Sequence, residues 1–389
     1  MLPGQSSSTF LLSDWRWPVS LTFRSGEASP HPCDIADLLT GLVSIPSLSG
    51  DECNAVAWLC DRMAKMGYRA LIDPAGNAVG TIGTGECEIL LLGHIDTVPG
   101  DIPVRVEDGI LHGRGAVDAK GPLATFVAAG AKARLPPGVQ LTVVGAVGEE
   151  TWGSPGASWL RDHYSRPDAV IIGEPSGWDG VVLGYKGSIS LTASVERPLS
   201  HSAGPETTAP EHMFAFWARL VGWLTEHNGD REPGFNTLDA TLRSFNATGD
   251  GLHERAELSA TFRLPSGTGS AWVREQTEQL ANGVSLDWTF NAEAYRSERT
   301  SPLVAPFLSA IRACGAKPRI KVKTGTSDMN VVGPVWGCPI VAYGPGDARF
   351  DHTPDEQIEL AEVEKAVEVL TMAIERIAAT LATEHGETA

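Results

Sequence analysis

The sequence predicts an α/β fold into which a smaller α+β unit is inserted. Nearly continuous apolar runs at residues 89–92 and 139–147 are typical of strands buried on both faces of a sheet, and they alternate with stretches of helical periodicity. From about residue 186 the pattern changes, because residues 189–195 alternate polar and apolar side chains as half-exposed strands do. The first pattern returns after Pro302, so the smaller unit interrupts the larger one.

The elements can be placed in order along the chain. Apolar residues at helical spacing predict helices that end near Ile45-Pro46 and Gly67, and an Ala-rich stretch predicts a helix over 122–133. Short apolar runs predict strands at 70–72, 78–82, 89–92, 139–147 and 169–172. The inserted unit is predicted to run strand–helix–strand–strand–helix–strand, with a helix over 210–227 and strands at 189–195, 258–264 and 284–290. The remainder predicts a helix to Cys314, strands at 320–322 and 340–343, and a closing helix from Glu356.

Three regions follow from these elements. Residues 1–30 are predicted to be an N-terminal extension, to which we assign no function. The larger α/β unit comprises residues 31–185 and 293–389, and the inserted unit comprises residues 186–292.

Composition restricts the class of protein. The chain has 389 residues, of which 42% are hydrophobic and 20% charged, as in ordinary globular proteins. A formal net charge of -18 argues against general binding to nucleic acid or to anionic membranes. Six cysteines without a CxxC pair, and the lack of a recognisable secretory or membrane-spanning segment, predict a soluble cytoplasmic protein.

Five polar segments lie where buried strands end or helices begin, which is where α/β sheets bind ligands. They carry His94 with Asp96, Asp118, the pair Glu149-Glu150, Glu174, and His352. Each segment alone also has a structural explanation: a structural histidine, helix caps at Asp118 or at Thr353 and Asp355, or a solvated turn at the two glutamates.

Together, these segments indicate a metal-dependent hydrolytic centre. Two histidines, one aspartate and two glutamates form a mixed nitrogen and oxygen ligand set that suits two divalent ions, with Zn²⁺ the first choice and Co²⁺ the alternative. Glu149 then remains as an unligated general base. The segments contain no cysteine, which argues against a closed structural zinc site. The motifs HExxH, GxSxG, GxxxxGK[ST] and CxxC are absent, so the sequence gives no support for zincin, serine hydrolase, P-loop or thioredoxin chemistry.

Residues 35–380 resemble the M20 family of metallopeptidases and deacylases, which includes acetylornithine deacetylase and succinyl-diaminopimelate desuccinylase. The resemblance implies a zinc-peptidase-like catalytic domain with an inserted ferredoxin-like lid, through which two chains form a homodimer. It implies that His94 and Glu174 hold one metal ion, that Glu150 and His352 hold the other, and that Asp118 bridges them. Asp96 would orient His94, and Glu149 would carry a proton from the attacking water to the leaving amine. The family also implies a cis bond between Asp118 and Ala119.

The resemblance implies a substrate side as well. His201 would reach into the partner's site and stabilise the oxyanion, Arg263 would hold a substrate carboxylate, and Gly325, Thr326 and Ser327 would form the substrate loop. A surface histidine and a strand-edge salt bridge are the structural alternatives for His201 and Arg263.

Three segments, 174–180, 183–187 and 323–332, are most similar to the LysK type of this family. That type hydrolyses the amide that joins lysine or ornithine to the C-terminal glutamate γ-carboxyl of a small acidic amino-group carrier protein. An N-acyl amino acid deacylase with the same residues is the alternative. A metal-binding protein without catalysis is disfavoured, because Glu149 and the whole ligand set are present. The identity of the released amino acid stays open.

A basic segment leads into the predicted substrate loop. Six cations and no acidic residue lie between Arg299 and Ser327. Because Lys317, Arg319, Lys321 and Lys323 alternate, we expect them to share one face of a strand. An acidic carrier could dock there by electrostatic steering, and a lysine-protected edge strand is the alternative.

Overall fold

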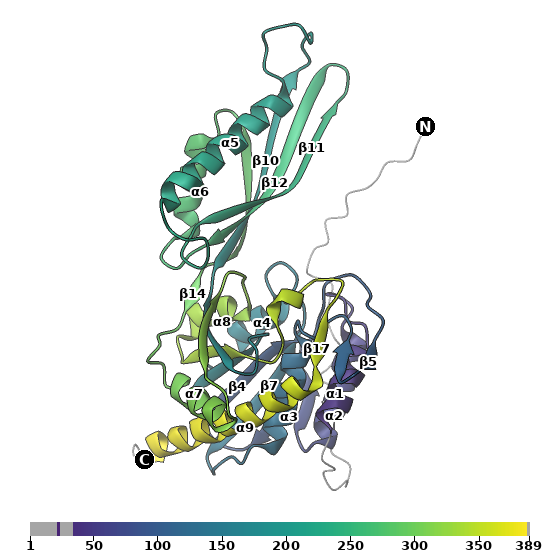
Figure 1. The fold of residues 1–389 in the computed structure, drawn as a ribbon, viewed down its shortest axis with the longest axis vertical. Coiled ribbons are helices and arrows are strands. Elements are labelled where there is room, and N and C mark those ends of the chain that lie inside the picture. Colours follow the sequence, from purple (N-terminus) through teal and green to yellow (C-terminus); the bar gives the residue numbers. More distant parts are fainter. Residues whose placement is uncertain (1–21, 24–33, 387–389) are drawn as a thin grey trace.

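The computed structural model describes residues 22–23 and 34–386, which form a larger lower lobe and a smaller upper lobe (Figure 1). The extension predicted at residues 1–30 lies outside the described residues, apart from the short strand β1 (Thr22–Phe23), which pairs with β2.

A ten-stranded mixed sheet forms the centre of the lower lobe, in the order β1-β2-β3-β7-β4-β8-β16-β9-β14, with β15 paired to β9. Its strands β4, β7, β8 and β16 are mutually parallel neighbours. The strands are β2 (Arg69–Ile72), β3 (Ala78–Gly83), β4 (Cys87–His94), β7 (Val139–Ala146), β8 (Ala169–Gly173), β9 (Gly180–Tyr185), β14 (Tyr295–Arg296), β15 (Arg319–Lys323) and β16 (Ile340–Tyr343).

Helices cover both faces of this sheet, which explains the continuous apolar runs of the sequence. In β4, Ile89 and Leu91 belong to one apolar core, whereas Leu90 and Leu92 belong to the other. The first core also includes α1 (Ile35–Val43), α2 (Cys53–Lys65), α3 (Lys120–Lys132), α7 (Val304–Ala313) and α9 (Leu360–Gly386). The second core includes α4 (Pro155–His163) and α8 (Asp328–Trp336). The predicted α/β class is therefore confirmed.

The upper lobe has the predicted strand–helix–strand–strand–helix–strand order. It consists of β10 (Gly187–Pro198), α5 (Ala209–Asn228), β11 (Asp239–Gly249), β12 (His253–Leu264), α6 (Ser270–Leu280) and β13 (Ser285–Ala292). The four strands form one antiparallel sheet in the order β11-β12-β10-β13, and its core includes Phe216, Leu191 and Phe262. Strand β11 was not located from the sequence, because most of its side chains are exposed on the sheet edge and lack an apolar alternation.

The prediction for the C-terminal helix was wrong by four residues. Helix α9 begins at Leu360, and residues Gln357–Glu359 form β17, which pairs with β6 (Ile110–His112). Strand β6 also pairs with β5 (Arg105–Glu107), so a three-stranded sheet lies beside the main one. Thr353 and Asp355 therefore precede a strand and do not cap that helix.

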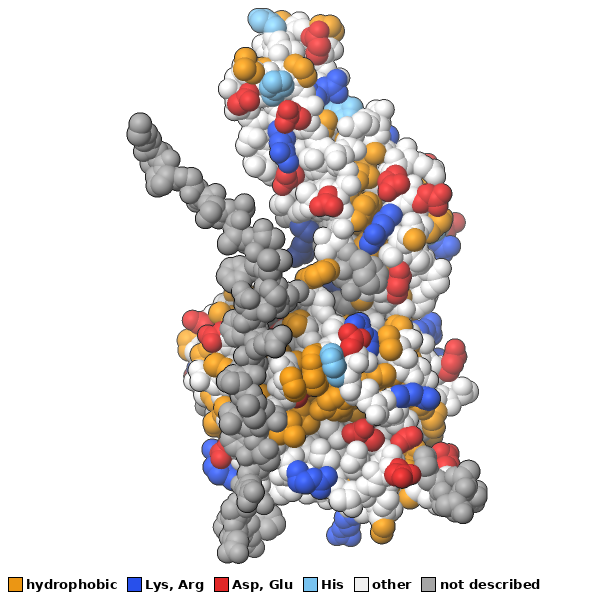
Figure 2. All heavy atoms as spheres, turned by 180° about the vertical axis from the view of Figure 1, so that it is seen from behind, with side chains coloured by type: hydrophobic (Ala, Val, Ile, Leu, Met, Phe, Trp, Pro, Cys, Tyr) orange, Lys and Arg blue, Asp and Glu red, His pale blue; other side chains and the backbone are white. Residues whose placement is uncertain are grey.

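Three further observations concern both lobes of the described chain. No helix within residues 22–23 and 34–386 is long and apolar enough to cross a membrane. The five cysteines in this part of the chain are all unpaired. On the rear face, acidic and basic side chains are interspersed over both lobes (Figure 2).

Candidate metal centre and substrate cavity

Strand topology gathers the predicted ligands at one edge of the large sheet. Strands β7, β4 and β8 are neighbours and run parallel, so their carboxyl ends lie together. His94 is the last residue of β4, Glu174 directly follows β8, and Glu149-Glu150 follow β7 after a short turn. Such an edge is where α/β proteins bind their ligands.

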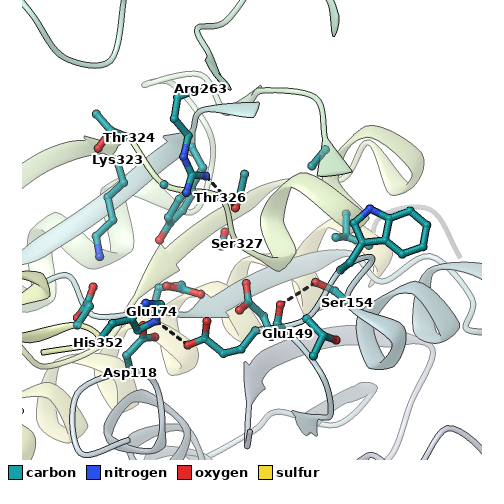
Figure 3. Close-up of a pocket in the computed structure, with 18 of the residues that line it drawn as sticks. Asp118, Glu149, Ser154, Glu174, Arg263, Lys323, Thr324, Thr326, Ser327 and His352 are labelled. Atoms are coloured by element: carbon teal, nitrogen blue, oxygen red, sulfur yellow. Dashed lines mark hydrogen bonds and ion pairs between the residues drawn. The ribbon is translucent and has the colours of Figure 1, made fainter. Parts of the chain in front are cut away.

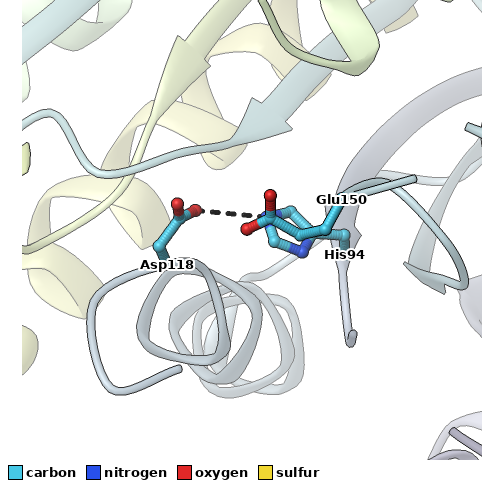
Figure 4. A group of neighbouring side chains, drawn as sticks. All are labelled: His94, Asp118 and Glu150. Carbon is cyan, nitrogen blue, oxygen red and sulfur yellow. Dashed lines mark hydrogen bonds and ion pairs between the residues drawn. The ribbon is translucent and has the colours of Figure 1, made fainter. Parts of the chain in front are cut away.

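Asp118 lies at the centre of the ligand candidates. Its Oδ1 is 3.3 Å from Nε2 of His94, and its Oδ2 is 3.1 Å from Nε2 of His352. His352 Nε2 also lies 2.8 Å from Glu150 Oε1. Ligand atoms of His94, Asp118 and Glu150 all lie within 4.8 Å of one another (Figure 4). One carboxylate with an oxygen toward each histidine has the geometry that a bridging ligand needs.

The donor set fits divalent ions of the zinc type, because imidazole nitrogens and carboxylate oxygens are their preferred non-thiolate ligands. Glu174, which was expected to join His94, lines a cavity of about 860 Å³ together with Asp118, Glu150 and His352 (Figure 3). It forms no hydrogen bond or ion pair with His94 within the described residues.

In the metal-free site, protons bound to the two histidines offset the negative charge of the neighbouring carboxylates. Hydrogen bonds to Asp118 and Glu150 raise the pKa of His352 to about 10. Burial opposes protonation of His94, but hydrogen bonds to Asp118 and Asp96 raise its pKa well above the usual value. Burial likewise disfavours ionised Asp118, yet both histidines hold its pKa below the usual range. Metal binding must therefore displace protons from both imidazoles.

Asp96, which was predicted to orient His94, also anchors a backbone turn. Its carboxylate is fully buried and lies 3.5 Å from His94 Nδ1, and its backbone oxygen lies 3.1 Å from the same nitrogen. Its Oδ1 and Oδ2 accept the backbone N–H groups of Glu149 and Glu150, each at 3.0 Å, and Oδ2 also accepts the Ser49 hydroxyl at 2.7 Å. One carboxylate thus fixes the turn that carries both glutamates.

Glu356 holds the Asp118 loop, a role that the sequence did not indicate. Its Oε1 accepts the backbone N–H groups of Val117 at 2.9 Å and of Asp118 at 3.0 Å. Its Oε2 pairs with Arg114 at 2.7 Å. Because Glu356 is far from Asp118 along the chain, only the folded structure reveals this contact. The bond between Asp118 and Ala119 is cis, as the family resemblance implied.

Asp351, Asp328 and Tyr185 lie in or beside the cavity, and the sequence analysis gave none of them a role of its own. Burial, together with the Asp118 charge, raises the pKa of Asp351 to about 7, and burial raises that of Asp328 to about 7. Asp351 and Tyr185 line the cavity, and Asp328 starts helix α8 next to the predicted substrate loop. The sequence could have indicated them only through their neighbours in the motifs, because Asp351 adjoins His352, Tyr185 adjoins Lys186 and Asp328 adjoins Ser327.

The cavity wall opposite the ligand candidates carries the predicted substrate residues (Figure 3). Gly325, Thr326 and Ser327 line it, and Arg263 donates from Nη1 to Thr326 Oγ1 at 3.3 Å. His201 is elsewhere: it lies on the exposed loop between β10 and α5 and does not line this cavity.

The basic segment is only partly a strand. Lys317 is exposed and precedes β15, so it does not share the strand face with the other three cations. Arg319 forms an ion pair with Asp179, and Lys321 donates to the carbonyl oxygen of Ser176. Lys323 lines the metal-site cavity.

The fold and the donor set define a metal-dependent hydrolase. The chain belongs to peptidase family M20/M25/M40, whose sequence model matches residues 90–376 and so includes every ligand candidate. Membership of this family implies divalent metal ions as cofactors.

Two curated relatives cover most of the chain. A Deinococcus radiodurans protein named [LysW]-lysine hydrolase is 45% identical over 352 residues, which make up 88% of this chain and 96% of that protein. A Saccharolobus islandicus protein named [LysW]-lysine/[LysW]-ornithine hydrolase is 29% identical over 343 residues, with 88% and 95% covered.

Solved structures share the fold. A Staphylococcus aureus tripeptidase superposes with a TM-score of 0.74 at 18% identity, and covers 90% of this chain and 99% of its own. A dinuclear metal-binding M20 peptidase of Bacillus subtilis superposes with a TM-score of 0.67 at 13% identity, with 89% and 98% covered.

Proposed function

We propose that this hydrolase cleaves the amide that joins lysine or ornithine to the C-terminal glutamate γ-carboxyl of a small acidic amino-group carrier protein. The observation that carries this proposal is the 45% identity, over 88% of the chain, to a protein named [LysW]-lysine hydrolase. The cavity is chemically suited to such a substrate, because Arg263 and Lys323 face the ligand candidates across it and can pair with substrate carboxylates.

His94 and Glu174 would hold one divalent ion, Glu150 and His352 would hold the other, and Asp118 would serve both. We propose Zn²⁺ as the native ion, with Co²⁺ able to replace it. When bound, the ions supply Lewis-acid polarisation of the scissile carbonyl and activation of water.

Glu149 is the proposed general base and acid. Its carboxylate takes a proton from the attacking water as the water oxygen bonds to the acyl carbon, and it returns that proton to the leaving nitrogen as the C–N bond breaks. Burial raises the pKa of Glu149 well above the usual range, so its protonated form is a competent donor to the amine. The bonds from Asp96 to the 149–150 backbone would hold this carboxyl in place.

We propose that residues 186–292 form a lid and dimerisation domain on a catalytic domain of residues 31–185 and 293–389. Strand β11 lies at an open edge of the upper sheet, and Phe214, Val221 and Leu242 are exposed large apolar side chains of this lobe. A homodimer would cover them, and it would allow His201 of one subunit to reach the partner's cavity.

The basic segment is the proposed approach route of the carrier. Lys317 and Arg319 are its exposed cations, but Arg319 already pairs with Asp179, and the half-buried Lys321 donates to the Ser176 carbonyl oxygen. We place the reaction in the cytoplasm, which is consistent with the unpaired cysteines of the described chain.

The test compares two matched substrates with the metal-loaded enzyme. One is lysine or ornithine joined to the terminal glutamate of the acidic carrier, and the other is the N-acetyl amino acid. Release from the carrier alone, lost in Glu149→Gln, supports the proposal. Release from the acetyl compound alone would replace it with a small-molecule deacylase.

A further inference from the structure

Tyr185 carries a buried hydroxyl group that has no partner in the described chain. This tyrosine ends β9, its side chain is only 1% exposed, and its ring belongs to the same core as Val332 and Trp336. No described residue forms a hydrogen bond with its hydroxyl oxygen. Burying an unpaired hydroxyl costs about 1–3 kcal/mol. Because Tyr185 also lines the metal-site cavity, a ligand in that cavity can supply the missing partner.

Lys323 lies directly beside Tyr185. The two residues are Cα partners in the parallel pairing of β15 with β9, just after a register shift in that pairing, so their backbones lie about 5 Å apart, and both side chains line the metal-site cavity. Lys323 lines the same cavity, and its ammonium points toward Glu174 and His352 in Figure 3. It forms no ion pair with any residue of the described chain. An ammonium and a phenolic hydroxyl side by side are a donor pair for a carboxylate.

The charge of the cavity favours an anionic ligand. Five carboxylates line it: Asp118, Glu149, Glu150, Glu174 and Asp351. Two divalent ions would contribute four positive charges, and Arg263 and Lys323 contribute two more. With neutral, metal-bound histidines the loaded cavity therefore has one formal positive charge in excess.

Lys323 lies where the metal-site cavity meets a second cavity. Lys323 and Ala348 line both the metal-site cavity and a second cavity of about 680 Å³, which also includes Arg319 and Lys321. The second cavity thus continues from the metal site along β15. Arg263 comes from the other lobe, so the two cations of the metal-site cavity approach a substrate from different sides.

We propose that Tyr185 and Lys323 form a carboxylate subsite for the acyl side of the substrate, and that it binds the main-chain carboxylate of the glutamate whose side-chain amide is cleaved. The inference rests on the proposed function, since the γ-linked C-terminal glutamate of that substrate has a free main-chain carboxylate on the acyl side of the scissile amide. Arg263 would then be left for the carboxylate of the departing amino acid. Recognition of the terminal carboxylate would distinguish the end of a carrier from an internal glutamate.

Two synthetic substrates test the subsite: N-acetyl-γ-glutamyl-lysine, and the same compound with its glutamate α-carboxylate converted to a primary amide. The wild-type enzyme should prefer the free carboxylate by at least about 10-fold in kcat/KM, the worth of one charge-assisted hydrogen bond. Tyr185→Phe and Lys323→Met should each lose about 10- to 100-fold on the carboxylate and stay within about threefold on the amide.

Tyr68→Phe is the matched control. The Tyr68 hydroxyl is also buried, but it donates to the Val127 carbonyl oxygen at 2.7 Å, and Tyr68 does not line the cavity. Tyr68→Phe should lower the denaturant midpoint and keep the substrate preference. Tyr185→Phe should keep or raise the midpoint and lose the preference.

Three results would overturn the subsite. Equal wild-type rates on both γ-glutamyl substrates would remove it and leave the proposed function intact. A lowered midpoint in Tyr185→Phe, with the preference retained, would assign the hydroxyl to the fold. Failure to cleave either γ-glutamyl substrate or the carrier-linked amino acid, with cleavage of an N-acetyl amino acid, would remove the proposed function and the subsite with it.

Discussion

Asp96→Asn is the change that most sharply tests how the site is built. The substitution preserves size and shape but replaces a carboxylate, which only accepts hydrogen bonds, by an amide that accepts on one side and donates on the other. The Asp96 oxygens accept three donors: the N–H groups of Glu149 and Glu150 and the hydroxyl of Ser49. Whichever way the amide turns, its NH₂ faces at least one backbone N–H group.

The magnitude follows from the bonds that are lost. A hydrogen bond to a charged acceptor contributes about 1.5–3 kcal/mol, and a buried N–H group left unpaired costs about 1–3 kcal/mol. We therefore expect Asp96→Asn to lower the free energy of unfolding of the metal-free protein by about 2–5 kcal/mol. His94 Nδ1 keeps its 3.1 Å contact with the backbone oxygen of residue 96. The turn that carries Glu150 loses its support, so metal affinity should fall by about 10- to 100-fold.

Urea unfolding of the chelator-treated protein measures the first quantity, and competition with a metal indicator measures the second. Ser49→Ala is the control, because it removes one bond to the same carboxylate and leaves both N–H groups paired. It should cost about 1.5 kcal/mol, the lower end of that range, because Ser49 is only half-buried, and it should change metal affinity little. An Asp96→Asn protein as stable as Ser49→Ala, with unchanged metal affinity, would refute the assignment of Asp96 as the anchor of the turn.

Four further predictions follow. Glu149→Gln should lower kcat by about 100- to 10,000-fold with unchanged metal content by elemental analysis; retained turnover would exclude it as the base. Mixed dimers of inactive Glu149→Gln and His201→Ala chains should regain activity, whereas continued inactivity would mean that His201 does not act across the interface. Lys317→Glu should raise KM for the carrier substrate but not KM for N-acetyl amino acids. Lys132→Glu makes the same charge change at the C-terminal end of α3 and should leave both KM values unchanged. Burial raises the pKa of Asp328 in the folded protein to about 7, above the unfolded value of about 3.9, so the stability of the metal-free protein falls as pH rises from about 4 to about 7. Asp328→Asn should therefore be more stable than the wild type at pH 8 but not at pH 4. An equal gain in stability at both pH values would contradict this.

The sequence located the candidate site because its chemistry follows local rules. His94 and Glu174 come at or directly after apolar strands, and parallel neighbours must bring such residues to one edge. The upper sheet was predictable for the same reason, since residues 189–195 alternate strictly and one face of β10 packs on α5.

The features that the sequence did not predict depend on contacts between segments that are distant along the chain. Glu356 supports Asp118 from the segment before α9, and no periodicity marks a carboxylate that accepts backbone N–H groups. The isolation of the Tyr185 hydroxyl is a property of its surroundings and not of its motif. Strand β17 pairs with β6, which is distant along the chain, and no local pattern marks that pairing, so the final helix was predicted to begin too early.

The most direct test of the di-metal centre is anomalous X-ray diffraction from crystals of the metal-loaded enzyme. The donor set predicts two ions in each chain, with Asp118 shared between them, His94 and Glu174 on one, and Glu150 and His352 on the other. A single ion at full loading, or a second ion that does not contact Asp118, would contradict the assignment of this site as a two-metal hydrolytic centre.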